Sequence, residues 1–178
     1  MAKRQTNKRA TAPRIILLSD ARNDAVLERA LARLPRGSAL VFRHYHLAQA
    51  ERRARFLTLK RAAKARGIRM IGARVPAGWG ADGVYGVASE FSGNPGLKLA
   101  TAHTLAEIGA AKRAGANAVL LSPVFATRSH PGAKVLGPVR FLLLARRSAL
   151  PVIALGGMTV RRAARIPVHG WAAIDGLV

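Results

Sequence analysis

Short apolar runs alternate with helical patterns along most of this chain. Each run is continuously apolar rather than alternating with polar residues, which is typical of a parallel strand buried on both faces. The runs predict eight strands, at residues 14–19, 38–43, 69–73, 83–87, 97–101, 118–122, 151–155 and 171–174.

The segments between these runs carry helical periodicity and helix-end signals. Thr104 and Glu107 have the spacing of a capping box, and Gly67 stands where a left-handed residue would end a helix. Helices are predicted at residues 24–34, 47–66 and 104–115, with two more beginning at Gly137 and Thr159.

Eight buried strands separated by helices predict an α/β fold, a compact TIM-type (β/α)8 barrel at residues 14–178. The chain has 178 residues, whereas such barrels usually have about 200 or more. The shortening is expected in residues 75–82, too few for a full helix after strand three, and in the absence of a closing helix after strand eight. A doubly wound open sheet is the alternative fold.

Composition narrows the chemistry. The chain has no cysteine, which excludes disulfides, thiolate zinc sites, iron–sulfur clusters and a cysteine nucleophile. No apolar run approaches the roughly 18 residues of a membrane span, and the basic start is not followed by a secretory apolar segment. We therefore expect a cytoplasmic protein with no membrane partner.

The net charge of +22 favours anionic partners. Residues 1–13 form a basic, flexible tail, but the remaining positive charge is spread along the chain. A nucleic-acid interface predicts clustered basic residues interleaved with aromatic ones, and aromatic residues make up only 5% of this chain. The pattern argues against nucleic-acid binding.

Function in such folds lies at the carboxyl ends of the strands, and phosphate often binds after strands seven and eight. Gly156-Gly157 follows the seventh predicted strand, and Asp175-Gly176 follows the eighth. Bare glycine amides, with a helix beginning at Thr159, favour a bound phosphate. The alternative is that the glycine pair only forms a tight turn.

The segment 122–137 is long for a connection from a strand to a helix. It carries hydroxyl and basic side chains within eight positions, namely Thr127, Arg128, Ser129, His130 and Lys134. Side chains of this kind can hold a second anionic group through charge-assisted hydrogen bonds. A basic surface loop without a ligand explains the spacing equally well.

These stretches together resemble the thiamine phosphate synthase and TenI family, whose members are (β/α)8 barrels. The resemblance is most specific in PVFATRS and PVIALGGMT, and it covers the chain in order. The stronger stretches are residues 115–132, 136–138, 151–159 and 170–176, and the weaker ones are residues 14–20, 40–45, 80–86 and 100–104.

The resemblance implies a chemistry and a set of ligands. Synthases of this family join a pyrimidine pyrophosphate to a thiazole phosphate and release pyrophosphate. By resemblance, the pyrophosphate is held by Arg43, Thr127 and Ser129, and the thiazole phosphate by Gly156, Gly157, Ile174, Asp175 and Gly176.

The sequence departs from the synthase pattern at the metal. Ala73 stands where synthases carry a magnesium-binding aspartate, which leaves Glu90 as a weak candidate for the second carboxylate. One carboxylate alone makes a poor Mg²⁺ site. Tyr45 and His130 stand where synthases carry lysines, so pyrophosphate departure loses further support.

TenI-type members resemble the synthases without the metal aspartate, and some catalyse a proton shift that aromatises the thiazole. Such a step needs a general acid/base near neutral pH, which suits histidine. By resemblance His103 is the candidate, although it could instead support the helix that follows. We expect His44, His46 and His169 to be ordinary surface or loop residues.

Three functions are therefore considered. The first is a TenI-like thiazole tautomerase that needs no cofactor, and the second is an atypical synthase that uses Mg²⁺ and both substrates. The third is a non-catalytic barrel that binds a phosphorylated ligand or nucleic acid. A homo-oligomer is compatible with all three.

Overall fold

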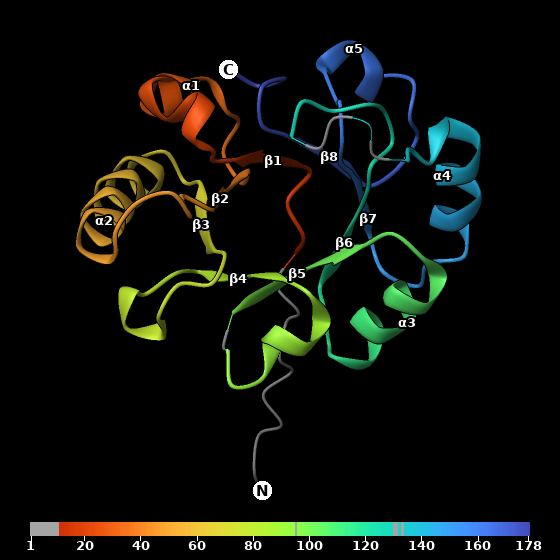
Figure 1. Cartoon of the computed structure of the whole chain (residues 1–178), viewed down its shortest axis with the longest axis horizontal. Coiled ribbons are helices and arrows are strands. Elements are labelled where there is room, and N and C mark those ends of the chain that lie inside the picture. The colour runs from red at the N-terminus through yellow and green to blue at the C-terminus, as the bar shows by residue number, and fades with distance from the viewer. Residues whose placement is uncertain (1–10, 95, 130–131, 133) are drawn as a thin grey trace, which may run out of the picture.

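A computed structural model describes residues 11–94, 96–129, 132 and 134–178. Eight parallel strands close into a barrel in sequential order, and β1 pairs with β8. Figure 1 shows the strands at the centre with the helices around them. The strands are β1 (Ile15–Leu18), β2 (Ala39–Phe42), β3 (Arg69–Gly72), β4 (Gly83–Gly86), β5 (Leu97–Ala102), β6 (Ala118–Leu121), β7 (Val152–Ala154) and β8 (Gly170–Ala173).

All eight predicted strands are confirmed, and closure of the barrel excludes the open sheet. The predicted capping box of Thr104 and Glu107 is present, and Gly67 has a φ of 66° after its helix. The α-helices are α1 (Leu27–Arg33), α2 (Gln49–Ala65), α3 (Leu105–Arg113), α4 (Gly137–Arg146) and α5 (Val160–Ala163).

The helical layer is reduced in more places than the sequence indicated. The helix predicted from residue 24 begins earlier, as a 3-10 helix, η1 (Ala21–Val26), whose first turn is capped by Asp20 and Asn23. Only the short 3-10 helix η2 (Ala77–Trp79) follows β3, as expected, but β4 is also followed only by η3 (Ala88–Phe91). Residues 174–178 form no helix.

Side chains on each strand alternate between the barrel interior and the layer beneath the helices. The interior holds Ala39 and Val41 of β2, while Leu40 and Phe42 pack outward against α1 and α2. This alternation is what aims the residues that follow each strand. Ala12, which the prediction places in the basic tail, packs into the interior cluster, and residues 1–10 lie outside the described residues.

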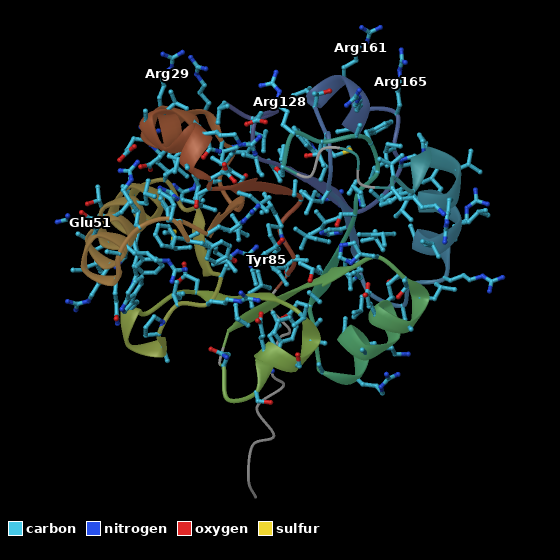
Figure 2. The ribbon with its side chains drawn as sticks, viewed as in Figure 1. Arg29, Glu51, Tyr85, Arg128, Arg161 and Arg165 are labelled. Atoms are coloured by element: carbon cyan, nitrogen blue, oxygen red, sulfur yellow. The ribbon has the colours of Figure 1, made fainter. Side chains whose placement is uncertain are left out.

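Positive charge is distributed around the molecule. Figure 2 shows Arg29, Arg161 and Arg165 pointing away from the barrel, with Tyr85 near its centre. Among the described residues, no helix has the length and apolar character needed to cross a bilayer.

Candidate functional site

Strand alternation continues past β2 and places two neighbouring residues on opposite sides. Arg43 shares the parity of Val41 and faces the mouth of the barrel, where its side chain is 22% exposed. His44 shares the parity of Phe42, and the two rings stack with centroids 4.6 Å apart. His44 is 1% exposed, so it lies in the loop after β2 as predicted but is buried rather than at the surface.

An ionic cluster connects the loops after β1, β2, β6 and β8 across the mouth. Asp20 accepts a hydrogen bond of 2.9 Å from Nε of Arg22 and lies 3.9 Å from Nη2 of Arg43. Arg22 also donates to Oγ of Ser129 at 2.9 Å and lies 3.5 Å from the carboxylate of Asp175. Arg22, which the sequence did not single out, thus brings Arg43, Ser129 and Asp175 to one place.

The charges in this cluster stabilise one another. Burial raises the pKa of Asp20, but hydrogen bonds from Arg22 and the charges of Arg22 and Arg43 outweigh it and leave that pKa below its ordinary value. The hydrogen bond to Asp20 likewise raises the pKa of Arg22. Asp20 therefore stays ionised and keeps two guanidinium groups together at the mouth.

The loops after β3 and β4 carry a second ion pair. Nε of Arg74 lies 3.0 Å from the carboxylate of Glu90, and both residues border a hollow of about 310 Å³. Arg74 is in the left-handed region, with a φ of 51°. Arg52 of α2 fixes this turn, because its guanidinium donates to the carbonyls of Ala73 at 2.7 Å and Arg74 at 3.0 Å.

These residues do not fit a Mg²⁺ site. The carboxylate of Glu90 is already paired with a guanidinium, and the position after β3 holds Ala73 rather than a second acid. Within the described part of the chain, no group of three or more His, Asp or Glu side chains is arranged to hold a metal.

Tyr85 of β4 is a further residue that the sequence did not single out. It packs against the interior cluster, and burial raises its pKa to about 12 despite the nearby charge of Arg43. The phenol therefore stays protonated and can donate a hydrogen bond beneath the mouth. Its place in the GVYGV strand is the signal that could have revealed it.

His103 follows β5 and is tied to the start of α3. Its backbone N–H donates to the carboxylate of Glu107, and its Nδ1 lies 3.2 Å from the same carboxylate. Burial raises the pKa of Glu107, but the hydrogen bonds and charge from His103 outweigh it and leave that pKa lowered. The imidazole is 56% exposed, and its Nε2 is the atom that a ligand could use.

The hydroxyl residues of the loop after β6 lie side by side. Oγ1 of Thr127 accepts the backbone N–H of Ser129 at 3.3 Å, which orients the Thr127 side chain within this turn. His130 lies outside the described residues.

The glycine pair after β7 packs closely against this loop. A Cβ on Gly156 would lie 2.7 Å from Cα of Pro123, and one on Gly157 would lie 2.5 Å from the carbonyl oxygen of Ala126. Both glycines also have positive φ, of 98° and 60°. Packing of the two loops therefore requires glycine at both positions, with or without a bound anion.

The loops after β7 and β8 meet at the mouth. A Cβ on Gly176 would lie 2.2 Å from the carbonyl oxygen of Met158. The amide of Asn23 donates to the carbonyls of Leu18 and Ile174, both at 3.0 Å, which fixes the β8 loop beside β1. Thr159 caps α5, but that helix has only four residues and contributes little dipole to the site.

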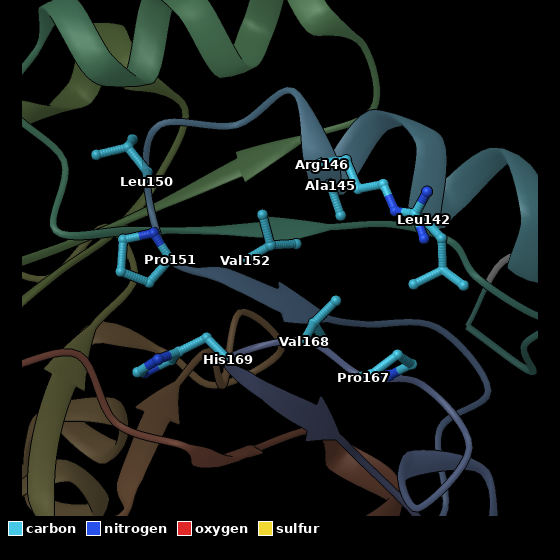
Figure 3. Close-up of a pocket in the computed structure, with 9 residues that line it drawn as sticks. All are labelled: Leu142, Ala145, Arg146, Leu150, Pro151, Val152, Pro167, Val168 and His169. Carbon is cyan, nitrogen blue, oxygen red and sulfur yellow. The ribbon is translucent and has the colours of Figure 1, made fainter.

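A groove of about 340 Å³ lies at the opposite end of the barrel. Figure 3 shows its walls, which come from α4 and from the segments that lead into β7 and β8. His169 is at its edge, and its Nε2 lies 3.0 Å from the carbonyl of Ala12. This groove is separate from the candidate site.

Comparisons with known proteins show which sequences this chain is similar to. Residues 96–177 match the family described as thiamine monophosphate synthase. "Putative thiamine-phosphate synthase 2" of Aquifex aeolicus (strain VF5) is 39% identical over 59 residues, which cover 33% of this chain and only about a third (32%) of that protein.

Solved structures share the fold. Thiamine phosphate pyrophosphorylase from Pyrococcus furiosus superposes with a TM-score of 0.75 at 21% identity, covering 91% of this chain and 85% of that one. FabK from Thermotoga maritima superposes with a TM-score of 0.68 at 17% identity, covering 93% and 59%. These structures show that the barrel itself is shared by proteins with different names. The sequence matches are to thiamine phosphate synthases, so the chain is related, through its C-terminal half, to the thiamine phosphate synthase and TenI family.

Proposed function

We propose that this protein binds thiazole phosphate at the carboxyl end of its barrel and is a TenI-like enzyme that moves a proton on the thiazole through His103. The observation that carries the choice of a metal-independent enzyme is the ion pair of Arg74 with Glu90, next to Ala73. A carboxylate held by a guanidinium is a poor ligand for Mg²⁺, which needs charged oxygen donors.

The phosphate is assigned to the meeting point of the loops after β7 and β8. The two loops meet where a Cβ on Gly176 would lie 2.2 Å from the carbonyl oxygen of Met158, next to Gly157, and Arg22 lies 3.5 Å from Asp175 at the edge. Main-chain amides and an adjacent guanidinium favour a monophosphate.

The proposed reaction takes a proton from one atom of the thiazole ring system and returns a proton to another, so no atom is gained or lost. Glu107 faces Nδ1 of His103, which leaves Nε2 to exchange the proton with the substrate. A carboxylate at one ring nitrogen orients the imidazole toward its ligand.

A second function, an atypical thiamine phosphate synthase, is favoured by a different observation. Arg43 and Ser129, the residues implied for pyrophosphate, are joined through Asp20 and Arg22. Two guanidinium groups could stabilise the charge of a leaving pyrophosphate. On this reading Mg²⁺ would enter with the substrate.

Calorimetry with thiazole phosphate, with and without Mg²⁺ and the pyrimidine pyrophosphate, separates the two. The TenI-like function predicts binding that Mg²⁺ does not change, and turnover that is lost in His103→Ala while binding is kept. His169→Ala is the matched control, because His169 lies at the other end of the barrel. Formation of thiamine phosphate from both substrates would favour the synthase, and failure to bind thiazole phosphate would overturn both.

A further inference from the structure

His44 is a buried histidine with both ring nitrogens engaged. Oγ of Ser19 lies 2.8 Å from Nδ1, and a carboxylate oxygen of Asp24 lies 2.7 Å from Nε2. Ser19 is fully buried, and the imidazole packs flat against Phe42. A buried polar chain of this kind specifies one arrangement of its members.

The direction of these hydrogen bonds follows from Ser19. The backbone N–H of Arg43 donates to Oγ of Ser19 at 2.8 Å, so the serine's own proton is free to point at Nδ1 of His44. Nδ1 then accepts, and the ring proton lies on Nε2 and points at Asp24. The imidazole is neutral, in keeping with burial, which lowers the pKa of His44 against the opposing charge of Asp24.

The hydrogen-bonded network of Ser19, His44 and Asp24 continues outward to the helices. The same oxygen of Asp24 accepts from Nε of Arg55 at 2.7 Å, and Arg55 pairs with Glu28. Arg55 belongs to α2 and Glu28 to α1, so two helices anchor the outer end of this hydrogen-bonded network. Besides Asp24 and Arg55, the titratable group facing His44 is His46, with ring centroids 5.3 Å apart.

Serine, histidine and aspartate in this order resemble a nucleophilic triad, but the geometry rules that role out. Ser19 has no exposed surface, and its oxygen is already bonded to the Arg43 amide and His44. A substrate carbonyl cannot reach it. The hydrogen bond from the backbone N–H of Arg43 to Ser19 joins this network to the mouth.

We propose that His44 is a positioning residue, which holds the Ser19 hydroxyl so that Arg43 is fixed over the mouth to bind a phosphate or pyrophosphate group of the substrate. For its anion the inference rests on the second proposed function, the atypical synthase, but the hydrogen bonds themselves join residues of the protein alone. Second contacts that orient a ligand-binding residue strengthen binding without touching the ligand.

Three substitutions at His44 separate its two bonds. In His44→Asn the amide oxygen replaces Nδ1 and can still accept from Ser19, whereas in His44→Gln the amide nitrogen replaces Nε2 and can still donate to Asp24. His44→Phe keeps the stacking on Phe42 and loses both bonds. Ser19→Ala breaks the link to Arg43 from the other side.

The probe is inorganic pyrophosphate, measured by calorimetry at one pH on the full chain, with thermal unfolding of every variant alongside. We expect affinity to fall about tenfold in His44→Gln, His44→Phe and Ser19→Ala, the effect of one lost hydrogen bond, and to be kept within about threefold in His44→Asn. The proposal would be overturned if pyrophosphate affinity across the variants correlated with their melting temperatures and not with whether the hydrogen bond to Ser19 is kept.

A measurement without ligand keeps this inference distinct from the proposed function. Hydrogen exchange of the Arg43 amide should be slow in the wild type and in His44→Asn, and about tenfold faster in His44→Gln and Ser19→Ala. Unchanged exchange in those two variants would refute the positioning role. If the exchange pattern is as expected but the wild type does not bind pyrophosphate, the anion site at Arg43 is refuted, whereas the positioning of Arg43 by His44 is supported.

Discussion

The two halves of the barrel mouth are built differently. After β1 to β4 the loops are held by charged and polar side chains, such as Asp20 with Arg22 and Arg74 with Glu90. After β6 to β8 they are held by close backbone packing, with Gly156 against Pro123 and Gly176 against Met158.

The region that matches the family covers the loops after β6 to β8, which are held by close backbone packing. Residues 96–177 cover the glycine-packed loops, where a side chain larger than hydrogen would collide with main-chain atoms. In the first half the loops are held by side chains, which bond other side chains or, as Arg52 does, main-chain carbonyls. The departures from the synthase pattern at Ala73 and Tyr45 lie there. A third departure, His130, lies within the matched residues, so the two kinds of loop differ in how they are held rather than in whether they depart from the synthase pattern.

The largest effect is expected from Gly156→Ala, which tests the packed half. The new methyl group would meet Pro123 and the φ of 98° would be strained, so we expect a loss of about 3 kcal/mol in the free energy of unfolding. Gly37→Ala is the control, because Gly37 has a φ of 83° but nothing within 4 Å, and it should cost about 1 kcal/mol. Equal losses in chemical denaturation would show that packing of the loops is not the cause.

In the charged half, the next effect is expected from Arg52→Met. Arg52 donates to the carbonyls of Ala73 and Arg74 and lies over the rings of Phe42, Tyr45 and Trp79. We expect a loss of about 2 kcal/mol, with the relief of its buried, unbonded Nε offsetting part of the cost. The exposed neighbour Arg53→Met should change stability by less than about 0.5 kcal/mol, and equal effects of the two would contradict the contacts assigned to Arg52.

A smaller effect is expected where a helix cap supports His103. Thr104→Ala removes the hydroxyl that accepts the Glu107 N–H at 3.2 Å and should cost about 1 kcal/mol in thermal unfolding. Thr159→Ala, at the four-residue α5, should cost less, because the helix it caps is shorter. A larger loss in Thr159→Ala would contradict this ranking.

The smallest effect is expected from pH. The pKa of His44 is lower in the folded chain than its ordinary value of 6.5, so the unfolded chain binds more protons just below that pH. Stability should therefore fall as pH drops below about 6.5, and His44→Asn should remove this part of the dependence. Asp24, whose pKa is also lowered, adds a separate loss below about pH 4. Identical denaturation profiles for wild type and His44→Asn between pH 5 and 7 would contradict the neutral state of His44.

The strands could be predicted because burial on both faces leaves a local signal, the continuous apolar run. The reduced helices after β4 could not, because residues 88–91 are short enough to be a loop or a helix until packing decides. The same limit explains η1, whose start is set by the reciprocal bonds of Asp20 and Asn23.

At the candidate site, the sequence allowed residues at the ends of strands to be predicted, but not the side chains that contact them. Arg43 is the last residue of a predicted strand and was identified by resemblance, and the alternation of side chains along that strand agrees with its place at the mouth. Arg22 was missed because its contacts with Ser129 and Asp175 join residues 107 and 153 positions apart. His44 was misjudged because its burial depends on Ser19 and Asp24, which reach it only when β1 and β2 pair.

The pairing of β1 with β8 has a consequence for synthesis on the ribosome. Residues 15–17 are made well before their partners at 171–173. Until then the apolar edge of β1 has no neighbour on one side, a state prone to aggregation. Closure of the ring therefore has to wait until β8 has been made, and until then the open edge of β1 can pair with another chain.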